Sequence, residues 1–113
     1  MAKALFLIMS GADSPMKMEL GITAAVRSLQ ANRYEDLKVI FFGPSEEYLT
    51  KIEGQVKSNF DLLLQSKAID SACSNVAERA NIKHELHKIG LNLIPAGERI
   101  AYYVNKGYEV ITF

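Results

Sequence analysis

The residue best suited to covalent chemistry is Cys73, the only cysteine in the sequence. It stands between a short segment, Ala68–Ala72, and a segment of helical character, Ser74–Arg79. If the first segment is a strand and the second a helix, the thiol lies at a helix N-terminus, where free N–H groups and the helix dipole lower a thiol pKa from about 8.5. This favours a partly exposed, nucleophilic thiolate. The alternative is a small buried hydrophobic residue.

Polar residues next to Cys73 and in one loop are further candidates. Ser74 and Asn75 would supply first-turn N–H groups, and side-chain donors, that stabilise the thiolate. The loop 10–14 follows an apolar run, so the backbone and hydroxyls of Ser10, Gly11 and Ser14 form a candidate ligand loop that could hold a phosphate. This loop lacks both the glycine spacing of a nucleotide loop and the Lys-Ser/Thr of a P-loop.

Two other groupings carry less chemistry. His84 and His87 lie three residues apart on an expected helix, but no second pair of ligands accompanies them, so we expect a solvated helix face and no metal site. Tyr102 and Tyr103 are adjacent on the last expected helix. If Tyr103 points inward, Tyr102 points elsewhere, toward either solvent or a subunit interface.

The expected elements alternate between strands and helices, which predicts a three-layer α/β sandwich: a mostly parallel sheet of about five strands with helices on both faces. Strands are expected at 4–9, 37–42, 68–72, 91–94 and 108–113, and the first of them is a continuous apolar run typical of a central strand. Helices are expected at 15–32, 45–52, 54–65, 73–80, 82–90 and 97–106. We expect Ser14, Ser45 and Asn81 to cap three of them, Glu46 and Glu47 to lie in the first turn of one, and Gly54 to break the helical region between 45 and 65. In the last helix, Ile100, Tyr103 and Val104 should point inward. In parallel sheets, sites gather at the carboxyl ends of the strands, where Cys73 and the loop 10–14 fall.

Composition narrows the functional class. The 113 residues suit one domain, 1–113, and the 13 basic and 13 acidic residues balance, which argues against nucleic-acid binding. No apolar stretch approaches the ~20 residues of a membrane span. A single cysteine cannot form an internal disulfide, so we expect a cytoplasmic protein whose thiol is free.

Three stretches together resemble the DsrE/DsrF-like family, whose YchN-like fold includes sulfur-relay subunits. They are Ala72-Cys73-Ser74-Asn75, Gly90-Leu91-Asn92-Leu93-Ile94-Pro95, and Gly97-Glu98-Arg99-Ile100 leading to Gly107-Tyr108. The resemblance implies an α/β sheet that assembles into trimers or hexamers, with Cys73 at the position of the cysteine that carries a persulfide in the relay members. The Cys-Ser-Asn context looks closer to small archaeal and bacterial members of undefined activity.

These observations lead to one functional hypothesis and one alternative. The hypothesis is a sulfur carrier, or sulfurtransferase-like protein, in which Cys73 accepts sulfane sulfur and passes it to a TusA-like or rhodanese-like partner, with no cofactor. The alternative is a non-catalytic assembly or small-ligand-binding protein with a packed cysteine. We also expect a homo-oligomer, because the apolar closing strand 108–113 has no following residues to cover it.

Overall fold

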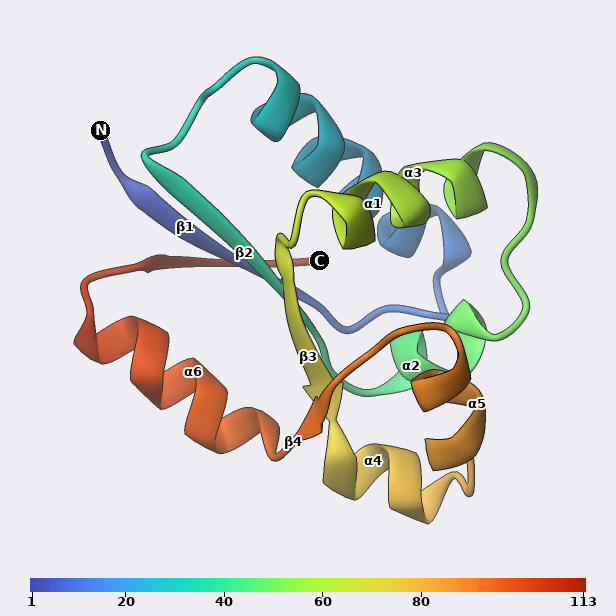
Figure 1. Ribbon diagram of the computed structural model, residues 1–113. Coiled ribbons are helices and arrows are strands. Elements are labelled where there is room, and N and C mark those ends of the chain that lie inside the picture. The colour runs from blue at the N-terminus through green and yellow to red at the C-terminus, as the bar shows by residue number, and fades with distance from the viewer.

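Five strands form one sheet in the order β4-β3-β2-β1-β5, and every neighbouring pair is parallel (Figure 1). The computed structural model describes all of residues 1–113. The strands are β1 (Lys3–Ile8), β2 (Asp36–Phe41), β3 (Ile69–Cys73), β4 (Leu93–Ile94) and β5 (Glu109–Thr112). The predicted α/β class and strand number are therefore confirmed, and the sheet is parallel throughout.

The apolar run at the start of the chain forms an interior strand, as predicted. β1 pairs with β2 on one side and with β5 on the other. Every residue from Ala4 to Ile8 is buried, which requires both faces of the strand to be covered. β5 and β4 are the two edge strands.

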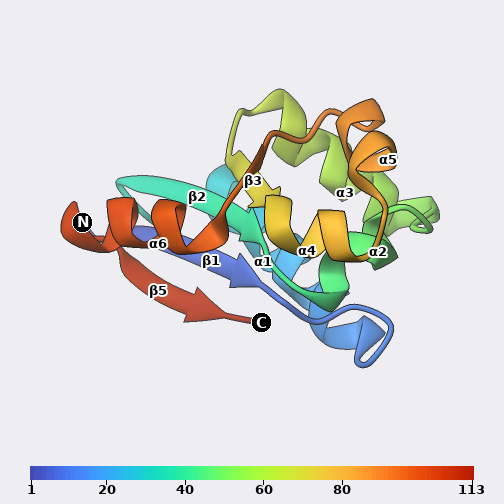
Figure 2. The same ribbon diagram turned by 90° about the horizontal axis from the view of Figure 1, so that it is seen from below.

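Helices connect successive strands and cover both faces of the sheet. They are α1 (Pro15–Gln30), α2 (Pro44–Leu49), α3 (Gly54–Gln65), α4 (Ser74–Arg79), α5 (Lys83–Lys88) and α6 (Ala96–Asn105). Figure 1 shows α1 and α3 side by side on one side of the strands and α6 on the other. Figure 2 shows α2 and α4 beyond the arrowheads, at the carboxyl edge of the sheet. No helix combines the length and the apolar composition that a transmembrane span needs.

The two faces of the sheet are covered very unequally. The face that carries Ala4, Phe6 and Ile8 packs against α1 to α5 in a cluster of 19 buried residues. The opposite face, which carries Leu5 and Leu7, packs against α6 in a cluster of only 6 buried residues. The α6 layer is therefore the thinner part of the hydrophobic core.

Sequence-based expectations about helix ends and faces need four corrections. Ser14 is the N-cap residue of α1, as predicted, but its side chain makes no cap hydrogen bond. Ser45 lies inside α2, behind the N-cap Gly43, and its hydroxyl donates to the Ile8 carbonyl at 2.7 Å. Asn81 has a positive φ of 58°, so it ends the turn after α4 instead of capping α5.

The fourth correction concerns Val104, which is exposed instead of inward. α6 contacts the sheet through Ala96, Ile100 and Tyr103, a stripe with helical spacing. Val104 follows Tyr103 by one residue, about 100° around the helix, and so leaves that stripe. The face of α6 that covers the sheet is consequently narrow.

Candidate functional site: the Cys73 cleft

Cys73 is the last residue of β3, at the carboxyl edge of the sheet. Its side chain belongs to the small cluster under α6, together with Ile40 and Ala96, and only 3% of the residue is exposed. The expectation of a partly exposed thiol is therefore wrong. Alternation along β3 turns this side chain toward the face that α6 covers, and the Ala96 turn closes over it.

The hydrogen bond to the Cys73 sulfur comes from α6 and not from α4. The backbone N–H of Ala96, the first residue of α6, donates to Sγ at 3.5 Å. The thiol therefore lies at the N-terminus of a ten-residue helix, whose dipole favours negative charge on the sulfur. Sequence analysis missed Ala96, although Pro95 before it and Glu98 in the first turn are both typical of a helix start.

Ser74 and Asn75 begin the six-residue helix α4, as predicted. Ser74 is half-buried and Asn75 is exposed, and neither side chain hydrogen-bonds to Sγ. Asn75 does lie on the wall of the space in front of the sulfur. Their stabilisation of the thiolate stays a prediction.

A cleft of about 280 Å³ opens in front of the sulfur. Two of its lining residues, Ala96 and Gly97, come from α6, and no atom stands within 4 Å of a side chain added at Gly97. The one charged side chain on its wall is that of Arg79, which is exposed and takes part in none of the ion pairs of the structure. The full lining is Phe42, Cys73, Asn75, Val76, Arg79, Ala96 and Gly97. The cleft thus presents a sulfur nucleophile, one helix N-terminus and one free cation.

A buried carboxyl also lies in α2, the helix that follows β2. Glu46, in the first turn of α2, is 0% exposed, and its Oε2 accepts a hydrogen bond from the Gly43 N–H at 3.1 Å. Its Oε1 has no hydrogen-bond partner. Burial raises the pKa of Glu46 to about 7, while the backbone groups of Gly43 and Cys73 act in the opposite direction. Sequence analysis took Glu46 only for a first-turn acid, because nothing local distinguishes it from the exposed Glu47.

An ion pair fixes α6 on β3, close to the cleft. Arg99 donates to both carboxylate oxygens of Asp70, at 2.9 and 2.8 Å, and the Tyr103 hydroxyl donates to Oδ1 at 2.6 Å. Burial alone would raise the pKa of Asp70, but hydrogen bonds from Arg99, Tyr103 and Ser71 outweigh burial and lower it. The Asp70 hydrogen bond raises the pKa of Arg99 above its usual range. Asp70 is therefore an ionised anchor for α6.

The candidate ligand loop lies at the same edge of the sheet but does not line the cleft. Ser10, Gly11 and Ser14 follow β1, which is two strand positions from β3, or about 10 Å at the usual spacing of ~4.8 Å. The Gly11 N–H is taken by Asp13 Oδ1 at 2.8 Å. Gly11 also passes so close to α2 that a Cβ there would lie 2.2 Å from the Pro44 carbonyl oxygen. The structure gives this loop a packing role, and ligand binding there stays a prediction.

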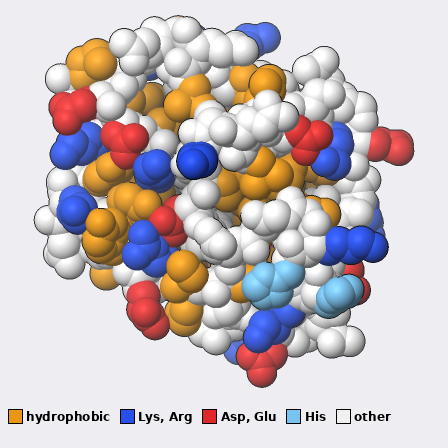
Figure 3. Space-filling model, in the orientation of Figure 1, with side chains coloured by type: hydrophobic (Ala, Val, Ile, Leu, Met, Phe, Trp, Pro, Cys, Tyr) orange, Lys and Arg blue, Asp and Glu red, His pale blue; other side chains and the backbone are white.

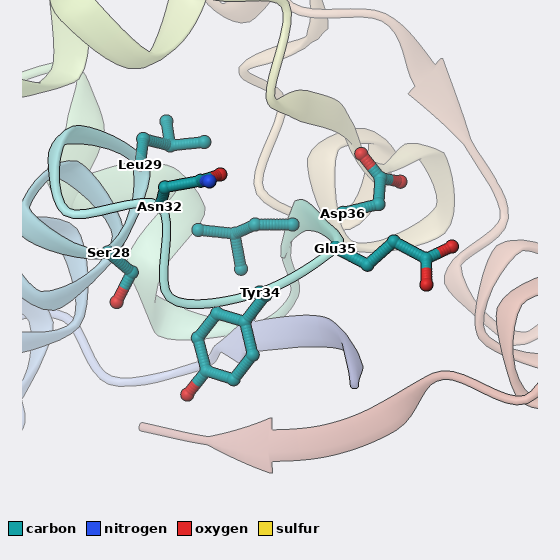
Figure 4. A pocket seen from close by; sticks show the side chains of 7 residues that line it. Ser28, Leu29, Asn32, Tyr34, Glu35 and Asp36 are labelled. Atoms are coloured by element: carbon teal, nitrogen blue, oxygen red, sulfur yellow. The ribbon is translucent and has the colours of Figure 1, made fainter. Parts of the chain in front are cut away.

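The histidines and the other hollows lie away from the sulfur. Both histidine side chains lie at the surface, and no group of three or more His, Cys, Asp or Glu residues is placed to hold a metal ion (Figure 3). A polar hollow at the end of α1, lined by residues that include Asn32, Glu35 and Asp36, has a volume of about 110 Å³ (Figure 4). A larger hollow of about 370 Å³, with Lys38 and Lys67 in its lining, lies at the amino ends of β2 and β3.

Comparison with known proteins identifies a fold and no activity. No family model matches the chain, and no curated protein matches it. Its structure is similar to that of the conserved protein of unknown function BT1422 from Bacteroides thetaiotaomicron, with a TM-score of 0.79 and 18% sequence identity. The match covers 98% of this chain and 94% of that chain. At this identity the likeness shows that the two proteins share the parallel α/β fold.

The Arg99–Asp70 pair yields a prediction about stability. Arg99→Met should lower the free energy of unfolding by about 2–4 kcal/mol, because it leaves the Asp70 carboxylate without its ion-pair partner. The loss should be smaller than for a fully buried pair, because this pair is partly exposed. Lys57→Met is the matched control, since the Lys57–Asp61 pair is exposed and should be worth less than about 1 kcal/mol. Urea unfolding at neutral pH measures both variants, and equal losses would contradict the anchoring role of Asp70.

The buried Glu46 carboxyl yields a prediction about pH. Its folded-state pKa of about 7 exceeds the ordinary 4.5, so the folded protein holds a proton that the unfolded chain releases. Its contribution to stability is therefore present below the ordinary pKa and is lost as pH rises through about 7. Between pH 5 and pH 8, the stability of the natural protein should fall relative to Glu46→Gln by about 2–3 kcal/mol. A difference between the two proteins that stays constant across this window in urea unfolding would refute the buried, protonated carboxyl.

Proposed function

We propose that this protein is a cytoplasmic sulfur carrier of the DsrE/DsrF-like type, in which Cys73 holds sulfane sulfur as a persulfide. The observation that carries the proposal is the Ala96 N–H hydrogen bond to Sγ, in a cleft that also reaches the surface. A helix N-terminus stabilises negative charge beside it, which favours both a thiolate and a persulfide anion. Carrier chemistry needs one nucleophilic sulfur and no second cysteine in the same chain.

The transfer step balances without an external oxidant. The Cys73 thiolate attacks the outer sulfur of a donor persulfide, R–S–SH, and a new S–S bond forms as the donor's S–S bond breaks. The inner sulfur of the donor leaves with the electron pair as the thiolate R–S⁻. Cys73 becomes a persulfide, Cys73–S–SH, whose proton came with the transferred outer sulfur. The reverse attack, by a cysteine of a TusA-like or rhodanese-like partner, regenerates the Cys73 thiolate.

The cleft limits what can approach the sulfur. Its volume of about 280 Å³ is at the lower end of small-ligand sites, which suits the end of a persulfide-bearing side chain or a small sulfur compound. Because the exposed guanidinium of Arg79 is unpaired, it would attract a donor that carries negative charge. The quoted motifs support the same assignment, since Gly97-Glu98-Arg99-Ile100 forms the first turns of the helix beside Cys73.

One observation favours the alternative of a non-catalytic protein with a packed cysteine. Cys73 is 3% exposed and packs among apolar side chains, as structural cysteines do. An inert cysteine in the fully packed state would neither react with a persulfide nor be alkylated readily in the native protein. The experiment below separates the two.

We also propose that the protein forms a homo-oligomer, a trimer or a hexamer. The edge strand β5 leaves Val110 40% exposed, on the same face as Leu5, with which it is in register. Met9 and Phe42, which pack against the same cluster, are only half-buried. A neighbouring copy would cover this apolar strip and the free backbone groups of the edge.

Persulfide formation on Cys73 tests the carrier function. After incubation with a polysulfide and removal of the excess, intact-mass spectrometry should show a gain of about 32 Da, one sulfur atom, on the natural protein. Cys73→Ser should fold with a loss under about 2 kcal/mol and should gain nothing. No gain on the natural protein, under conditions that load a known carrier, would favour the packed-cysteine alternative.

Light scattering at micromolar concentration tests the assembly. The expected mass is three or six times the 12.6 kDa of one chain. Val110→Lys places a charge on the exposed strip of β5 and should shift the mass toward one chain without unfolding it. A natural protein that scatters as a single chain would refute the oligomer.

A further inference from the structure

We propose that the hollow at the amino ends of β2 and β3 binds the phosphate group of a small phosphate monoester, through Lys38 and Lys67. The volume of this hollow, about 370 Å³, exceeds that of the Cys73 cleft and lies in the range of small-ligand sites. Cys73 lies at the other end of β3, ~13 Å away along the strand. The hollow is therefore a separate site, and the proposal does not rest on the sulfur chemistry.

Lys38 points to a ligand, because it lies where the sheet otherwise carries apolar side chains. Its strand, β2, is an interior strand, and its register partner Leu5 and its neighbour on the same face, Ile40, are both fully buried. Lys38 itself is half-buried. Its ammonium donates to the Lys67 carbonyl at 3.3 Å and takes part in none of the ion pairs of the structure. An ammonium has three N–H donors, so two of them remain for a ligand.

Lys67 brings a second unpaired cation to the same hollow. It follows α3 with a φ of 61°, and the other non-glycine residues with positive φ are both asparagines. This left-handed conformation suits glycine or asparagine and costs a lysine more. The backbone therefore does not account for a lysine at this position, whereas a contact between its ammonium and an anion in the hollow does.

The one acid that lines the hollow leaves both lysine charges free. Each carboxylate oxygen of Asp70 already accepts two hydrogen bonds. Those to Oδ1 come from Arg99 and Tyr103, and those to Oδ2 come from Arg99 and Ser71. The Arg99 guanidinium also balances the charge of Asp70. The lysines therefore face an acid that is already neutralised, and an anion can enter beside it.

The donors of the hollow fit a phosphate better than a carboxylate. Lysine is a point charge with rotatable donors, whereas a planar carboxylate is matched best by the fork of an arginine. A phosphate monoester carries nearly two negative charges at neutral pH, one for each lysine, and has three acceptor oxygens. The exposed amide of Asn92 adds donors on the wall, and Leu64 and Ile69 offer an apolar surface to the rest of the molecule.

An NMR titration of the native full chain with glycerol 2-phosphate tests the site. The ionic strength is held constant with sodium chloride, so that general screening does not change. Backbone amide signals of Lys67, Asp70 and Asn92 should shift and saturate. Succinate, a dicarboxylate of similar charge, should bind at least three times more weakly. The absence of saturable shifts at these residues would overturn the proposal, and equal or tighter binding of succinate would overturn the phosphate assignment.

Three variants assign the binding to the two lysines. Lys38→Met and Lys67→Gly should each weaken binding about three- to tenfold, as expected for the loss of one partly exposed charge contact. Glycine suits the left-handed backbone, so the urea midpoint of Lys67→Gly should hold or rise while its binding weakens. Lys83→Met is the matched control, because Lys83 is exposed and does not line the hollow. Its affinity should equal that of the natural protein.

The same measurements separate a specific site from a general effect of charge. Equal weakening in Lys83→Met and Lys67→Gly would overturn the proposal, and so would unchanged binding in Lys67→Gly, even if Lys38→Met failed to fold. Cys73→Ser should bind glycerol 2-phosphate as the natural protein does. Failure of the sulfur carrier and failure of this site are therefore distinguishable.

Discussion

The geometry of the candidate site depends on the ion pair between Asp70 and Arg99. α6 buries only two of its residues fully, Ala96 and Tyr103, so apolar packing alone holds it weakly against the sheet. The two-pronged Arg99–Asp70 contact, with the Tyr103 hydroxyl on the same carboxylate, fixes both the rotation and the position of the helix along β3. That position sets the Ala96 N–H on the Cys73 sulfur and the Gly97 turn at the cleft. The ion pair at Asp70, three residues before Cys73, thus determines which backbone group contacts the Cys73 sulfur.

The parallel sheet supplies the rest of the arrangement. Because all strands run the same way, β1, β2 and β3 each end at one edge, and the segments that follow them meet there. Glu46 arrives after β2 and Cys73 at the end of β3, and the larger core behind them holds both strands in register. The larger core cluster therefore makes the strand ends of the site rigid. The α6 layer supplies the Ala96 N–H that donates to the sulfur and two residues of the cleft wall.

Sequence patterns predicted what is local and missed what is long-range. The apolar run at Ala4–Ile8, the break at Gly54 and the place of Cys73 between a strand and a helix are all encoded within a few neighbouring residues, and the structure confirms them. Ala96 is different, because it meets Cys73 only through the fold. The burial of Glu46 also depends on the fold. Nothing in Glu46-Glu47 reveals which carboxyl is buried, since that depends on how α2 packs. The same limit explains the error at Cys73, whose exposure was argued from one helix start while another helix covers it.

The unequal division of the core also changes what the burial of Cys73 means. Proteins open in cooperative parts as well as globally, and a part held by few buried side chains opens at a lower free energy than the whole. The 6-residue cluster under α6 is such a part, and Cys73 belongs to it. A local opening that moves α6 away from the sheet would leave the larger cluster folded and would expose the Cys73 sulfur to solvent. The 3% exposure of Cys73 then describes the resting state, and the rate at which a bulky partner reaches the thiol becomes a matter of opening frequency.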